Sequence, residues 1–218
     1  PRLSPAVSRS ACQAPRVTEP VDTLRAPHFA NGRFFNPWGV GKASLLDVAR
    51  WKLWSRNRYY KGRLPRVPWV ANDGGSLRRR AELPEATWIG HATFVLQDGL
   101  DVLLTDPHFG PRALLPRRFL PPGLPLSAIP ESAVAILSHN HYDHLDEASV
   151  RALNTQADGP PLFVVPLGVK PWLAELGITN VIELDWWQTH RLHGRDGSVE
   201  IVLTPAQHWS GRTLADRL

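Results

Sequence analysis

The chain has 218 residues, 43% of them hydrophobic, which allows one sizeable core, with or without an extension. A single cysteine, Cys12, excludes a disulfide framework and a cysteine-based zinc site, and no apolar run approaches the about 20 residues of a membrane-spanning helix. The net charge of +5 conceals a division. Residues 1–80 hold 16 Lys and Arg against 4 Asp and Glu, or +12, whereas residues 81–218 hold 9 against 16, or −7. Such asymmetry concerns surfaces and partners rather than the fold.

The first residues of the chain carry little secondary-structure signal. Residues 1–27 are aperiodic and rich in Pro, Ser and Arg, which predicts a disordered arm. Because the sequence contains no methionine, we expect an N-terminus that has been processed or trimmed. Ser10-Ala11-Cys12 has a weak similarity to a lipoprotein cleavage site. Arg9 and the lack of a preceding apolar segment argue against a lipid anchor at Cys12.

Residues 28–80 form a basic, aromatic-rich extension in which we predict one helix. Ser44 and Asp47 have the spacing of a capping box, and an apolar stripe follows them. Trp51 and Trp54 widen that stripe. The surface either packs on the rest of the protein, which is the commoner explanation, or lies at a membrane interface where Arg and Lys reach the headgroups.

After the extension the sequence changes to short β-rich segments with tight connections. Residues 87–97 alternate, Asp98-Gly99 fits a two-residue hairpin turn, and residues 100–105 return. A proline-rich loop over 107–130 precedes the apolar run 133–137, which predicts a fully buried strand. Further predicted elements are helices at 147–156 and 169–176 and strands at 162–165, 180–185 and 199–204.

Four side chains that bind metals well lie within six residues, in the pattern His139-x-His141-x-Asp143-His144. Residues two apart in an extended segment point the same way, so His139 and His141 can share one metal. Asp143 and His144 lie where the chain turns towards the next helix, and they can face a second metal. Two-metal hydrolytic sites hold ions about 3.5–4 Å apart. A solvated polar loop would not explain this crowding, so the stretch predicts a metal site.

His208 is a second candidate ligand, because it also lies just past a β-rich strand. With His139 and His141 it would give one metal three nitrogen ligands and an open position for water, which is a catalytic rather than a closed structural pattern. His91 and Asp106 are predicted to orient the ligands from outside. The remaining histidines are predicted at the surface, with a pocket-lining role open for the last two: His28, His108, His190 and His193.

These residues resemble the metallo-β-lactamase superfamily and, within it, the N-acylphosphatidylethanolamine-hydrolysing phospholipase D group. The pattern from His139 to His144 is similar to the superfamily's signature, whereas the Asp185-Trp186-Trp187 and Gln207-His208-Trp209 blocks point to the group. The similarity covers about residues 30–218. Its blocks are Asn31–Trp38, Trp88–Thr93, Leu104–Pro107, Ser138–Asp146, Val165–Gly168, Ile182–Trp187 and Thr204–Trp209.

The resemblance implies an α/β (α+β) fold, the αββα sandwich, with only its N-terminal half present at residues 81–218. It implies two zinc ions. The first would be held by His139, His141 and His208, and the second by Asp143 and His144, which would also be the catalytic residues. The family also needs a bridging aspartate and a final histidine, and both would lie beyond Leu218. We therefore expect the N-terminal part of a longer enzyme, inactive alone, with an apolar sheet face and unpaired strand edges exposed.

The implied reaction is hydrolysis of a phosphodiester bond in N-acylphosphatidylethanolamine-like lipids by a dizinc-activated water. Trp51 and Trp54 are then candidate contacts to the substrate or to an anionic membrane surface, and the protein is expected to be cytoplasmic or peripherally membrane-associated. Three alternatives remain: a lactonase or amide hydrolase of the same superfamily, a nuclease, and a non-catalytic zinc-binding remnant. Nucleic acid is disfavoured because the basic residues lie outside the acidic half. The acyl chain of the substrate and the oligomeric state do not follow from the sequence.

Overall fold

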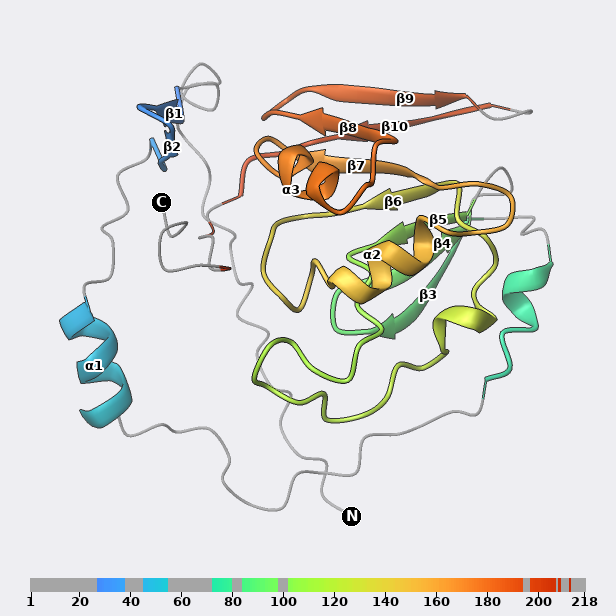
Figure 1. Ribbon diagram of the computed structural model, residues 1–218, viewed down its shortest axis with the longest axis horizontal. Helices are drawn as coiled ribbons and strands as arrows, with labels where there is room; N and C mark the ends of the chain where they lie inside the picture. Colours follow the sequence, from blue (N-terminus) through green and yellow to red (C-terminus); the bar gives the residue numbers. More distant parts are fainter. Residues whose placement is uncertain are drawn as a thin grey trace, which may run out of the picture.

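A six-stranded sheet forms the centre of the protein, in the order β3-β4-β5-β6-β7-β8 (Figure 1). The computed structural model describes residues 27–37, 45–54, 72–79, 84–97, 102–193, 197–206, 208 and 212. The strands are β3 (Glu85–Gly90), β4 (Thr93–Gln97), β5 (Val102–Thr105), β6 (Val134–Ile136), β7 (Leu162–Pro166) and β8 (Val181–Leu184). Strands β3 to β5 pair antiparallel, and β5 to β8 pair parallel. The carboxyl ends of β5, β6, β7 and β8 therefore meet at one edge, where ligands bind in open α/β sheets.

Two helices cover one face of the sheet (Figure 1). They are α2 (Glu147–Leu153) and α3 (Lys170–Glu175). Asp146 is the N-cap of helix α2, because its carboxylate accepts a hydrogen bond from the backbone N–H of Ser149. Val150 and Leu153 point from α2 into the main core, where Phe163 of β7 is also fully buried. The near-continuous apolar runs of β6 and β7 suit strands that are buried on both faces.

An antiparallel hairpin packs on the other face of the sheet. Its strands are β9 (Thr189–His193) and β10 (Ser198–Val202). Leu192, Val199 and Ile201 of the hairpin contact a buried cluster formed by Leu103, Val134, Val164 and Leu184. At the β3–β4 end of the sheet the cross-strand pair Trp88 and Phe94 remains 61% and 37% exposed. Within the described residues, the hairpin thus covers only part of this face.

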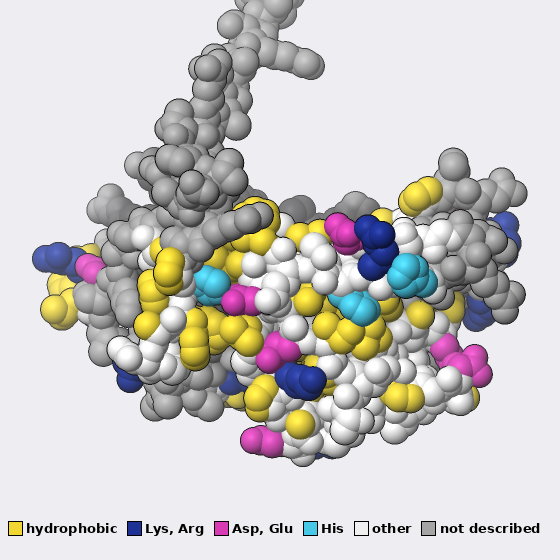
Figure 2. Space-filling model, turned by 90° about the horizontal axis from the view of Figure 1, so that it is seen from above, with side chains coloured by type: hydrophobic (Ala, Val, Ile, Leu, Met, Phe, Trp, Pro, Cys, Tyr) yellow, Lys and Arg dark blue, Asp and Glu magenta, His cyan; other side chains and the backbone are white. Residues whose placement is uncertain are grey.

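A small N-terminal hairpin, β1 (Phe29–Ala30) and β2 (Arg33–Phe34), is fastened to the end of β8. The ring of His28 stacks on Trp186 with 3.9 Å between centroids, and its Nε2 lies 2.6 Å from Oδ1 of Asp185. The turn Asn31-Gly32 has positive φ at both residues, as the type I′ turn of a two-residue hairpin requires. Figure 2 shows apolar side chains gathered at this end of the molecule. The exposed aromatic residues there are Phe29, Phe34 and Phe35.

Helix α1 (Leu45–Trp54) is present as predicted, but its described apolar side chains do not pack. Leu46, Leu53 and Trp54 are 74–79% exposed, so packing on the rest of the chain does not explain this part of the stripe. The side chain of Trp51 lies outside the described residues. Among the described helices, none is long and apolar enough to cross a bilayer.

Several sequence-based expectations differ from the structure in detail. Residues 87–97 were predicted as one β segment, but they form parts of two strands separated by a turn at His91-Ala92, where φ is 144° at Gly90 and 52° at His91. Strand β9 was missed because its side chains are largely polar and alternate between exposed and half-buried. The predicted arm at 1–27 (except Pro27), Cys12 and the Asp98-Gly99 turn lie outside the described residues.

Candidate metal centre

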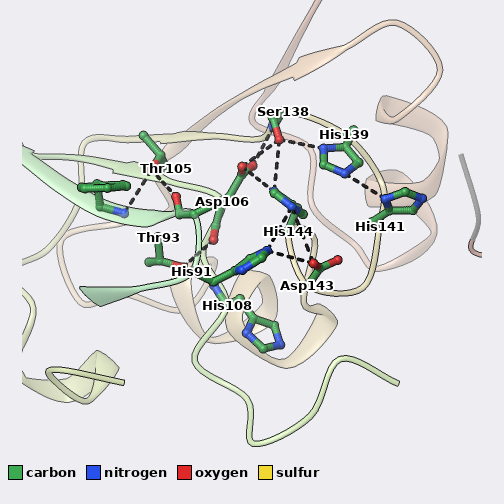
Figure 3. A network of polar contacts seen from close by, with 12 residues as sticks. His91, Thr93, Thr105, Asp106, His108, Ser138, His139, His141, Asp143 and His144 are labelled. Atoms are coloured by element: carbon green, nitrogen blue, oxygen red, sulfur yellow. Dashed lines mark hydrogen bonds and ion pairs between the residues drawn. The ribbon is translucent and has the colours of Figure 1, made fainter. Parts of the chain in front are cut away.

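The histidines and carboxylates come together at the edge of the sheet where its parallel strands end (Figure 3). Asp106 follows β5, and the loop from His139 to His144 follows β6. Strand β3 runs in the same direction as β5, because both are antiparallel to β4, so its last residue, Gly90, delivers His91 to this edge too. His208 arrives from the segment after β10.

The first group consists of His139, His141 and His208, which offer ligand atoms within 4.8 Å of one another. Nδ1 of His141 lies 3.0 Å from Nε2 of His139 and 3.0 Å from Nε2 of His208. One ring nitrogen can donate or accept a single hydrogen, so it cannot form a proper hydrogen bond with both neighbours. A cation at the shared position would satisfy all three lone pairs.

His139 is held in the neutral form that a metal requires. Burial lowers the pKa of His139 to about 4, and repulsion from His144, His208 and His141 adds to the effect, while Asp106 opposes it. A neutral imidazole offers its lone pair without first losing a proton, so binding to this residue is not opposed by acid until well below pH 6.

The second group consists of His91, Asp143 and His144, again with ligand atoms within 4.8 Å. Nε2 of His91 lies 2.8 Å from Oδ2 of Asp143 and 3.3 Å from Nε2 of His144. Burial opposes ionisation of Asp143, but a backbone hydrogen bond and the neighbouring histidines outweigh it and lower the pKa of this carboxyl. Asp143 thus favours the anionic form. The sequence had suggested that His91 orients ligands from outside, whereas the structure places it among the candidate ligands themselves.

Asp106 lies behind both groups and is only 6% exposed. Its Oδ2 accepts a hydrogen bond from Nδ1 of His144 at 2.8 Å, and its Oδ1 accepts one from the backbone N–H of Ser138 at 2.7 Å. Burial alone would lower the pKa of His144, but the hydrogen bond and charge of Asp106, with Asp143, raise it. This contact fixes the ring so that Nε2 of His144 faces the second group.

Ser138 links Asp106 to the first group by hydrogen bonds. Its Oγ lies 2.7 Å from Oδ2 of Asp106 and 2.9 Å from Nδ1 of His139. Because a carboxylate only accepts, the hydroxyl donates to Asp106 and accepts from Nδ1–H of His139, which leaves Nε2 of His139 for the first group. One carboxylate therefore sets the ring orientation of a candidate ligand in each group. The rings of His139 and His144 lie 4.0 Å apart between centroids, so the two groups adjoin.

Arg212 fastens the ligand loop to the segment that carries His208. Its guanidinium lies between the rings of Tyr142, at 4.5 Å, and Trp172, at 4.3 Å. Its Nη1 donates to the backbone oxygens of Leu145 at 2.7 Å and Asn140 at 3.0 Å. Arg212 could not be singled out from the sequence, since an isolated arginine carries no signal that it contacts a distant loop.

The other residues singled out in the sequence lie elsewhere. His108 was predicted at the surface, but it is 3% exposed, with Nε2 facing the backbone oxygen of Arg112 at 3.2 Å. The prediction for His28 was also wrong, because its side chain is 15% exposed and pairs with Asp185. Trp54 is 76% exposed on α1.

Comparison with known proteins finds relatives that share this part of the chain. A family model described as "Beta-lactamase superfamily domain" matches residues 102–217. The chain is 36% identical over 135 residues to the mitochondrial N-acyl-phosphatidylethanolamine-hydrolyzing phospholipase D of Saccharomyces cerevisiae, covering 60% of this chain and 28% of the relative. It is 31% identical over 205 residues to N-acyl-phosphatidylethanolamine-hydrolyzing phospholipase D 1 of Caenorhabditis elegans, covering 86% and 56%.

A third relative is an uncharacterized protein of Mycobacterium bovis, which is 32% identical over 203 residues, covering 88% of this chain and 52% of the relative. The chain thus spans about half the length of two of these relatives and 28% of the yeast protein.

Proposed function

The chain belongs to the beta-lactamase superfamily, and from that membership we propose that it carries most of the metal centre of a zinc-dependent phosphodiesterase. The proposed reaction is of phospholipase D type, acts on N-acylphosphatidylethanolamine-like lipids, and releases an N-acylethanolamine and phosphatidic acid. Two relatives named for this activity support the choice of substrate class. The observation that carries the proposal is the pair of adjoining ligand groups at one sheet edge.

The residues of both groups fit zinc. The first offers three imidazole nitrogens, and the second offers two imidazoles and a carboxylate. Zinc accepts these ligands with tetrahedral geometry, and three protein ligands leave a position for water in each group. When bound, two zinc ions would lower the pKa of a bound water to near neutrality and polarise the phosphate oxygens.

The chain's own residues prepare the centre for that chemistry. Asp106 directs Nε2 of His144 and, through Ser138, Nε2 of His139 towards the centre. Asp143, whose pKa is lowered, supplies negative charge to the second group without needing to lose a proton. Water as the attacking group makes a nucleophilic side chain unnecessary.

A substrate panel tests the proposal on the longest protein that contains this chain, loaded with zinc. Vesicles containing N-acylphosphatidylethanolamine, a lactone and an N-acyl amide would be compared, since a lactonase or amide hydrolase would use the same metal residues. We expect release of N-acylethanolamine, loss of that release on chelation, and its return on adding zinc. Turnover of only the lactone or the amide would overturn the proposed substrate class.

A further inference from the structure

The connection between β5 and β6 contains a closed hairpin that the metal centre does not use. The backbone N–H of Arg118 donates to the oxygen of Pro111 at 2.9 Å, and that of Ala113 donates to Pro116 at 3.0 Å. An antiparallel bridge joins Arg112 and Arg117. The tip of the hairpin is therefore Leu114-Leu115. We call residues 111–120 the docking hairpin.

Large apolar side chains project from the docking hairpin into solvent. The exposed fraction is 59% for Leu114, 80% for Leu115, 68% for Phe119 and 39% for Leu120. Single exposed apolar residues are ordinary on protein surfaces, but four within seven residues are not. Leu114 also has a φ of 59°, a conformation that leucine rarely adopts, so the tip holds its shape against the local preference of the residue.

The charges of the same segment have one sign. Arg112 and Arg117 are exposed beside the apolar tip, and residues 107–130 contain no Asp or Glu. Apolar residues flanked by arginines, without acidic residues, match the chemistry of an anionic lipid surface. The apolar groups enter the acyl boundary, and the guanidinium groups meet the phosphates.

The base of the docking hairpin contacts the two segments that carry the second ligand group. On one side, Nη2 of Arg118 donates to the backbone oxygen of His108 at 2.7 Å. The same guanidinium packs against Gly90, the neighbour of His91, so closely that a Cβ on Gly90 would lie 3.4 Å from its Nη1. On the other side, the carboxylate of Asp146 lies 3.2 Å from the Cβ position of Gly110. In Figure 1 the hairpin belongs to the light green connection below α2. A surface that held the tip would therefore also hold the metal centre close by.

From this arrangement we propose that the docking hairpin binds anionic phospholipid bilayers and seats the metal centre at the depth of the lipid headgroups. The purpose of this contact rests on the proposed lipid substrate, but the contact itself is independent of turnover. It differs from the membrane contact predicted at Trp51 and Trp54, because it places the anchor beside the ligands rather than on α1.

Sedimentation with vesicles of phosphatidylcholine alone, or mixed with phosphatidylglycerol, tests the proposal. The variant Leu114→Asn with Leu115→Ser removes the apolar tip, with asparagine chosen because it tolerates positive φ. We expect at least about tenfold weaker binding to the mixed vesicles, since two leucines lose their apolar contact. Arg117→Gln should weaken binding about fivefold at low salt and little at high salt.

The matched control is Leu167→Ser with Val202→Ser, two exposed apolar residues that lie outside both the docking hairpin and α1. Its binding should change less than twofold, and unchanged zinc content would show that each variant is folded. Equal vesicle binding by the tip variant and the unchanged chain would overturn the proposal. A tip variant that still binds vesicles but no longer associates with itself would overturn it too. Vesicle binding without hydrolysis of any lipid by the longest protein that contains this chain, loaded with zinc, would refute the proposed function but not the lipid contact of the docking hairpin.

Discussion

At the scale of single residues, one buried carboxylate orients the ligands of both groups. Asp106 contacts His144 directly and reaches His139 through Ser138. Such outer contacts commonly change metal affinity by about 10–100-fold. We therefore predict that Asp106→Asn weakens zinc binding by about that factor at both sites. Ser138→Ala should weaken only the first site. Competition with a chelator measures both constants, and equal loss at the two sites in Ser138→Ala would contradict the relay.

His139 also makes the metal-free protein sensitive to acid. Its pKa is lowered to about 4 in the folded state, mainly by burial, whereas the value in the unfolded chain is near 6.5. As pH falls from about 6.5 to 4, the unfolded state binds a proton at this histidine that the folded state does not bind. The free energy of unfolding therefore decreases. Urea unfolding across this window, with His139→Gln as the comparison, should show the decrease in the unchanged chain and a smaller one in the variant. An NMR titration of His139 near pH 6.5 would disprove the shift.

At the scale of elements, Arg212 joins two segments that arrive separately at the centre. It follows His208 by four residues and holds the loop that carries His139 and His141. Arg212→Ala removes two cation–π contacts, each worth about 0.5–1 kcal/mol, together with two hydrogen bonds. We predict weaker zinc binding at the first site by about tenfold or more. Arg212→Lys should recover only part of it, because an ammonium cannot reproduce the planar fork. The rate of backbone hydrogen exchange in residues 139–145 should rise in Arg212→Ala. An exchange rate and a zinc affinity that both stay unchanged would refute this role of Arg212.

How far the elements could be predicted depends on how local their signal is. The apolar runs at 133–137 and 162–165 predicted β6 and β7 because a strand buried on both faces needs them. The turn after Gly90 was missed, since β-rich residues lie on both sides of it. That error also hid the place of His91, which reaches Asp143 from the tight turn between β3 and β4. The spacing within His139 to His144 could be read directly, whereas the contacts of Asp106 and Arg212 depend on the tertiary fold.

At the scale of the whole molecule, the described chain offers six candidate ligands and an apolar sheet face that is partly open at Trp88 and Phe94. The relatives are longer than this chain, and among the residues that the structure describes the two candidate ligand groups share no member. We predict that residues 1–218 alone do not hydrolyse phosphodiesters, because no carboxylate among the described residues belongs to both groups and could fix the separation of the two ions. The rate of phosphodiester hydrolysis by the purified chain should be the same with and without added zinc. Zinc-dependent release of N-acylethanolamine by this chain would refute the prediction.

The central claim is that two adjoining groups each hold a zinc ion, and zinc content after equilibrium dialysis tests it most directly. The longest protein that contains this chain should retain about two zinc ions. His139→Ala combined with His141→Ala should remove the ion of the first group, since only His208 would remain there. His190→Ala with His193→Ala is the matched control and should change nothing. A zinc content that stays the same in the His139 and His141 double variant would contradict the account.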